Sequence, residues 1–107
     1  MENQNITMVK GDTLSFGVAC EDQEGVPVEL DTAYFTCKKN PSSTGNLFRK
    51  SLGNGITYND DHYVIRVAPE DTAHAEIGRY YYDLEVGVGD DIFTILKGIL
   101  AIEQDIS

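Results

Sequence analysis

The chain has 107 residues with 18 acids against 8 bases, a formal net charge of −10 and a hydrophobic share of 41%. This length suits a single domain over residues 1–107, and the hydrophobic share suffices for a core. The negative field opposes phosphate, so nucleic acid and anionic membranes are excluded as favoured partners. Apolar runs are too short for a transmembrane helix, and the polar N-terminus predicts no secretion through a signal peptide.

Apolar residues recur at every second position, in short runs separated by Gly, Asn and Asp. This period is typical of strands with one buried and one wet face, so the chain predicts an all-β, antiparallel β-sandwich of seven to nine strands. In chain order, the expected strands are 6–9, 13–21, 28–30, 33–39, 47–52, 56–58, 62–68, 79–88 and 92–103. In the clearest run, alternation sends Tyr80, Tyr82 and Leu84 inward and leaves Arg79, Tyr81, Asp83 and Glu85 in solvent.

The segment 69–76 breaks the strand pattern. Pro69 at a first helical position, acids in the first turn and Gly78 beyond the end predict one or two helical turns. Tyr80 follows this segment, as in the corner before strand F of immunoglobulin-like domains, where a Tyr hydroxyl bonds upstream backbone. We therefore expect a short helical crossing between the two layers of the sandwich.

The last strand, 92–103, carries apolar residues on both parities. A β-bulge at Lys97-Gly98 would send one set of side chains inward, namely Phe93, Ile95, Leu100 and Ile102. Alternatively, a straight strand would present apolar side chains on both faces, which would indicate a partner. The bulge is the favoured interpretation.

The two cysteines, Cys20 and Cys37, fall at inward positions of their strands. Their spacing matches no zinc motif, because no CxxC pair is present. We expect two reduced core thiols, with a disulfide between them as the alternative.

Acids gather in two predicted turns, Asp60-Asp61 beside His62 and Asp90-Asp91. If both turns met at one end of the sandwich, they would be weak candidates for a calcium site. The favoured interpretation is that these acids only solvate their turns and bond their own backbone. We expect no metal and no cofactor.

No nucleophile with a base, paired carboxylates or phosphate-binding glycine loop is evident, so we expect no catalytic residue and no enzymatic activity. The exposed tyrosines at 34, 58 and 81 are weak candidates for a sugar-stacking platform. The alternative function is therefore a carbohydrate- or calcium-binding β-sandwich module.

Four stretches carry a resemblance to a known family, namely 6–16, 25–33, 69–73 and 78–86. They resemble small immunoglobulin-like domains of phages and prophages of Gram-positive bacteria, similar to the N-terminal domain of phage baseplate upper proteins and related tail-associated proteins. The resemblance implies an immunoglobulin-like sandwich that helps attach host-recognition parts to a phage tail. It contains no site, so no functional residue carries over.

The resemblance implies a structural, protein-interaction role in a virion, with other virion or tail proteins as partners. The protein would then reside in the host bacterial cytoplasm during assembly and afterwards in the particle. Edge strands with unpaired backbone can pair with another chain. We expect docking or self-association around strands 6–9 and 92–102, through Ile6, Met8 and Ile99.

Overall fold

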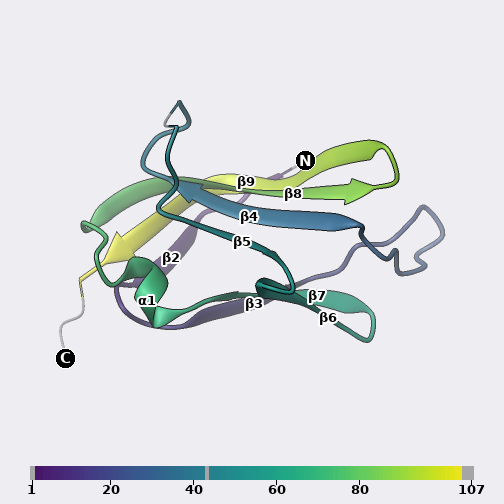
Figure 1. Cartoon of the computed structure of the whole chain (residues 1–107), viewed down its shortest axis with the longest axis horizontal. Coiled ribbons are helices and arrows are strands. Elements are labelled where there is room, and N and C mark those ends of the chain that lie inside the picture. Colours follow the sequence, from purple (N-terminus) through teal and green to yellow (C-terminus); the bar gives the residue numbers. More distant parts are fainter. Residues whose placement is uncertain (1, 43, 105–107) are drawn as a thin grey trace.

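Two packed layers of strands make up the part of the chain described by a computed structural model, residues 2–42 and 44–104 (Figure 1). Within these residues there are nine strands and one short helix: β1 (Glu2–Asn3), β2 (Ile6–Val9), β3 (Leu14–Val18), β4 (Thr32–Lys38), β5 (Phe48–Leu52), β6 (Gly55–Asn59), β7 (His62–Val67), α1 (Pro69–Thr72), β8 (Gly78–Val88) and β9 (Asp91–Glu103). No helix of the described residues is long and apolar enough to cross a membrane.

The order of the strands in the two layers shows which type of β-sandwich this is. One layer runs β9-β8-β4-β5 in antiparallel pairing, with β1 and β2 both added parallel to β9. The other layer runs β6-β7-β3, and a short parallel link from Ser51 and Leu52 to Gly55 and Ile56 joins the layers. The orders G-F-C-C′ and D-E-B of immunoglobulin variable domains match these two layers. The all-β, immunoglobulin-like prediction is confirmed.

An aromatic cluster fills the centre between the layers. Phe35 on β4 is fully buried, and its ring centroid lies 5.5 Å from that of Phe16, 6.0 Å from Phe48 and 5.3 Å from Tyr82. Such tilted and edge-to-face pairs add to the free energy that burial alone supplies. Antibody domains place a Trp and a disulfide at the equivalent centre. Here packed aromatic rings occupy that place.

The segment that crosses between the layers contains a helix, as the sequence predicts, but this helix is shorter than predicted. The prediction placed a helical segment at 69–76, whereas α1 ends at Thr72 and is followed by a turn. The hydroxyl of Tyr80 donates a 2.8 Å hydrogen bond to the carbonyl of Glu76. This bond confirms the expected tyrosine corner before β8.

Two polar contacts hold α1 against the strands. Asp71 Oδ2 accepts the Ala68 N–H at 2.7 Å and pairs with Lys50 Nζ of β5 at 2.5 Å. Thr72 is fully buried, and its hydroxyl accepts the Gly11 N–H at 2.9 Å. The helix is therefore attached to both layers of the sandwich.

The expected strand at 28–30 does not form. In its place, an isolated bridge joins Glu21 and Pro27, and the expected strand at 13–21 ends at Val18. The cause is a tight turn in which Asp22 Oδ1 accepts the N–H groups of Glu24 and Val26 at 2.8 and 3.0 Å. A side-chain oxygen that bonds nearby backbone in this way competes with strand pairing.

The bulge in β9 exists, but it lies closer to the start of the strand than predicted. Leu84 of β8 pairs with Leu96 and Glu85 pairs with Thr94, so Ile95 is the extra residue. The expected bulge at Lys97-Gly98 is wrong, and so is a straight strand. Leu100 and Ile102 are buried as predicted, Ile95 is half-buried, and Phe93 on the inner face remains 52% exposed at the end of the sandwich.

Candidate interaction surface

The alternation of side chains along β8 determines which of its residues lie on the outer face of the β9-β8-β4-β5 layer. Its residues Tyr80, Tyr82, Leu84 and Val86 are buried, as the sequence predicts. Tyr81 therefore points outward and is 41% exposed. The cross-strand partners of Tyr81 are Lys38 of β4 on one side and Ile99 of β9 on the other.

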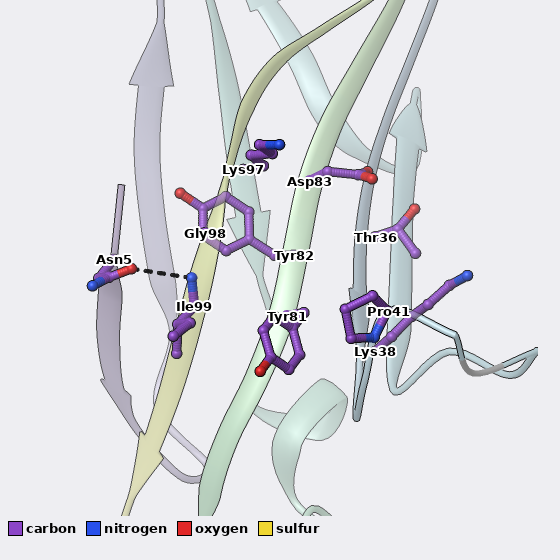
Figure 2. A pocket seen from close by; sticks show the side chains of 10 residues that line it. All are labelled: Asn5, Thr36, Lys38, Pro41, Tyr81, Tyr82, Asp83, Lys97, Gly98 and Ile99. Atoms are coloured by element: carbon purple, nitrogen blue, oxygen red, sulfur yellow. Dashed lines mark hydrogen bonds between the residues drawn. The ribbon is translucent and has the colours of Figure 1, made fainter. Parts of the chain in front are cut away.

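A groove of about 480 Å³ opens around Tyr81 (Figure 2). We call it the outer groove, and it is lined by Asn5, Thr36, Lys38, Pro41, Tyr81, Tyr82, Asp83, Lys97, Gly98 and Ile99. In Figure 2 the side chains of Tyr81, Pro41 and Ile99 lie below those of Lys97 and Asp83, and Lys38 lies beside Pro41.

The N-terminal segment forms one wall of the outer groove. Asn5 Oδ1 accepts the N–H of Ile99 at 3.2 Å (Figure 2). The Gln4 carbonyl accepts the Tyr82 hydroxyl at 2.6 Å. Burial raises the pKa of the Tyr82 hydroxyl, so it remains a donor well above neutral pH. Gly98 is required here, because an added Cβ would overlap the Gln4 carbonyl.

A second, polar depression of about 340 Å³ adjoins the groove and shares Thr36, Lys38 and Asp83 with it. Its floor includes Tyr34, and the guanidinium carbon of Arg49 lies 4.1 Å from the Tyr34 ring centroid. A cation over an aromatic face is an attractive arrangement that orders both groups. Together the two depressions present bases and acids in nearly equal number, unlike the acidic remainder of the chain.

The chemistry of this face suits binding. The lining of the two depressions together is a mixture of aromatic, aliphatic and charged groups. An apolar, aromatic centre inside a charged rim is the arrangement found in protein–protein interfaces.

Of the three residues predicted to form an interaction surface, Ile99 is the one that lines the outer groove. Met8 is 5% exposed and belongs to the core, and Ile6 packs against that core. The prediction is wrong for Met8, because β2 pairs parallel with β9 and turns Met8 inward beside buried Ile102; Ile6 lies on the same face and is half-buried. Alternation along β8 and β4 was the signal for the rest of the surface, namely Lys38, Tyr81 and Asp83.

The acidic turns form no shared cation site. Asp60 and Asp61 lie in the turn between β6 and β7, and Asp90 and Asp91 lie at the turn between β8 and β9. The Asp61 carboxylate contacts His62 Nδ1 at 3.0 Å, and this hydrogen bond lowers the pKa of Asp61. Over residues 2–42 and 44–104, no three His, Cys, Asp or Glu side chains gather to hold a metal ion. The described residues therefore lend the calcium interpretation of these turns no support, and it stays a prediction.

The three candidate stacking tyrosines also fail to converge. Tyr34 and Tyr81 lie on the outer face, whereas Tyr58 lies on β6 in the other layer. The ring centroid of Tyr58 is 4.8 Å from that of Tyr63. The ring of Tyr34 is further covered by Arg49. A platform made from all three tyrosines does not exist.

Both cysteines are free thiols, and the alternative of a disulfide is not formed. Cys37 on β4 is fully buried, and burial raises its pKa to about 12. Cys20 follows β3 and is half-buried, and burial also raises its pKa.

Comparison with models of known protein families and with curated proteins gives no match. Among solved structures, the chain is similar to one from a structure-based photo-crosslinking analysis of multimeric cell-adhesive interactions of VGSC beta subunits. That match has 12% sequence identity and a TM-score of 0.41, and it covers 98% of this chain and 93% of the other. The assignment of the fold rests on the strand pairing, and no function follows from this likeness.

Proposed function

We propose that the chain is a non-enzymatic protein-interaction module that docks through the outer groove. The observation that carries this proposal is the exposure of Tyr81 between Lys38 and Ile99 on a paired, rigid sheet face. Aromatic anchors at the centre of a patch supply a large share of the binding free energy in protein interfaces. Lysines and Asp83 around this anchor supply the charged rim that selects a partner.

The proposed setting is a phage or prophage particle, with tail or baseplate proteins as partners. The support is the resemblance of four stretches, in the same order along the chain, to phage-encoded immunoglobulin-like domains. In this proposal the module assembles in the bacterial cytoplasm and then remains in the virion. The sandwich supplies rigidity, and the outer groove supplies the contact.

The test uses the tail and baseplate proteins encoded beside this chain, each purified and titrated against it by biolayer interferometry. We expect one of them to bind, and Tyr81→Ala to weaken binding by about thirtyfold, the effect of a typical hot-spot residue. Ile99→Lys should also weaken binding, because it places a charge in the apolar centre. Ile77→Lys is the control for an added surface charge, since Ile77 is an exposed apolar residue that does not line the outer groove.

Failure of every such protein to bind would remove the phage setting. Binding that is unchanged by Tyr81→Ala and Ile99→Lys would move the contact away from the outer groove. Heat released on titration with a glycan panel or calcium would favour the carbohydrate- or calcium-binding alternative.

A further inference from the structure

The strand β3 has a neighbour on one side only. Within the described residues it pairs with β7 and ends the strand order, while β1 and β2 pair with β9 in the other layer. A strand at such an edge presents unpaired backbone groups, which many proteins guard with charged residues or Pro. The five residues of β3, Leu14 to Val18, include no charge and no Pro.

Beside this edge the two layers are open. A cleft of about 450 Å³, which we call the flank cleft, is lined by Val18, Ala19, Cys20, Glu21, Val28, Leu30, Val86, Val88, Phe93, Ile95 and Leu96. All but Glu21 are apolar, and Phe93 is 52% exposed although it points to the inner face. A cavity of about 150 Å³ already holds a benzene ring, so the flank cleft has room for two or three apolar side chains.

The end of the molecule that holds the flank cleft is strongly acidic. Figure 1 shows the β3–β4 loop and the β6–β7 and β8–β9 turns together at this end. These loops and turns carry half of the chain's 18 acids, namely Glu21, Asp22, Glu24, Glu29, Asp31, Asp60, Asp61, Asp90 and Asp91. No Lys or Arg occurs in 11–37 or in 80–96, the two stretches that line the cleft.

A hydrogen bond between two of the loops, and the charges that surround Tyr58, place these acids near one another. Asp31 Oδ2 accepts the Gly89 N–H at 2.6 Å, which ties the β3–β4 loop to the β8–β9 turn. The charges of Glu29, Asp60 and Asp61 all contribute to raising the pKa of Tyr58, after its desolvation and the neighbouring Tyr63. The field at the cleft therefore attracts cations.

We propose that β3 and the flank cleft accept an extended segment of a partner protein with alternating apolar side chains and flanking Lys or Arg. The segment pairs with β3 as a further strand of the β6-β7-β3 layer, and its apolar side chains enter the flank cleft. Its basic residues lie among the acids of the surrounding turns. This surface is separate from the outer groove.

Charge selects this occupant over a second copy of the chain. Two copies each carry a formal net charge of −10, and antiparallel pairing of β3 with β3 about Phe16 would bring Asp12 close to Glu21 of the other copy. Like charges in close approach oppose association. A basic segment meets no such repulsion.

The test uses a synthetic peptide with valine at alternate positions, threonine between them and two lysines at each end, titrated by fluorescence anisotropy. We expect binding that weakens with salt and falls about tenfold or more when the lysines become glutamates. Amide hydrogen exchange should slow at Leu14–Val18 when the peptide binds. Alkylation of Cys20 by iodoacetamide should slow as well, because the peptide covers the flank cleft.

Phe93→Lys and Ile92→Lys form the matched pair of variants. Both residues are exposed neighbours on β9, but Phe93 pairs with buried Val86 on the inner face whereas Ile92 points outward. Both changes alter net charge equally. We expect Phe93→Lys to weaken peptide binding about tenfold and Ile92→Lys to leave it within about twofold.

Three outcomes would overturn the proposal. Peptide binding without slower exchange at Leu14–Val18 would exclude strand addition. Equal binding of the lysine and glutamate peptides would exclude a basic partner. No peptide binding together with concentration-dependent dimers that Phe93→Lys disrupts would make a second copy the occupant. Loss of outer-groove binding in Tyr81→Ala affects none of these readouts, so the two proposals fail separately.

Discussion

Strands β3 and β7 are neighbours in one layer, yet they bury their apolar side chains to different extents. Inward residues Tyr63, Ile65 and Val67 of β7 are at most 3% exposed, whereas Leu14 and Val18 of β3 remain half-buried. Both strands alternate equally well in sequence. The difference arises because β7 has a paired strand on each side and β3 has one only. Burial of an alternating strand therefore depends on its place in the sheet as much as on its own residues.

The largest expected effect contrasts these two strands directly. Ile65→Ala on β7 should lower the free energy of unfolding by about 2–5 kcal/mol, because it leaves a cavity at a fully buried position. Leu14→Ala on β3 should cost no more than about half as much, since solvent already reaches that side chain. Urea unfolding of both variants measures the difference. Equal losses would mean that β3 is covered in solution.

The next effect contrasts the two thiols. Burial raises the pKa of Cys37 to about 12 from 9.0, so the unfolded chain releases this proton first as the pH rises. Stability that is present below about pH 9 is then lost progressively toward pH 12, by about 2–3 kcal/mol at pH 11. Urea unfolding at about pH 8 and pH 11 should show this loss of stability. In Cys37→Ala the part of the loss that comes from the Cys37 thiol should be absent.

Half-buried Cys20 provides the control for Cys37, because its pKa is raised but its side chain keeps contact with solvent. Cys20→Ala should leave most of the alkaline loss in place. A pH dependence that is equal in both variants would assign the loss to other groups, of which Tyr82 is the first candidate, since burial raises its pKa too.

The smallest effect contrasts a glycine of β9, which is paired on both sides, with a glycine of the edge strand β3. Gly98→Ala should cost about 1–3 kcal/mol, because the added methyl overlaps the Gln4 carbonyl and displaces the N-terminal segment. Gly17→Ala on β3 should change stability by less than about 0.5 kcal/mol, since the nearest atom to its methyl, at 3.1 Å, belongs to the half-buried His62 side chain, which can shift. Thermal unfolding measures both variants. Faster amide exchange over Ile6–Val9 in Gly98→Ala alone would confirm the cause.

Alternation in the sequence was enough to predict the sandwich and the register of β8, because period-two burial is a local property. The tyrosine corner at Tyr80 was also predictable, since its bond to Glu76 spans only four residues. The inward turn of Met8 was not, because it depends on parallel pairing with Ile102, far away in the chain. The outer groove needed the same long-range information, since Asn5 and Ile99 form its wall together.

The pairing of β2 with β9 also sets the order of events when the chain folds. Ile6 pairs with Leu100 and Val9 with Glu103, so the first long strand has its partner at the far end of the sequence. At about 5–20 residues per second of synthesis, the ribosome needs several seconds to supply that partner. During this interval Ile6–Val9 lacks the strand with which it pairs in the folded chain. We therefore expect this edge to close late in folding, because contacts so distant in sequence are slow to form.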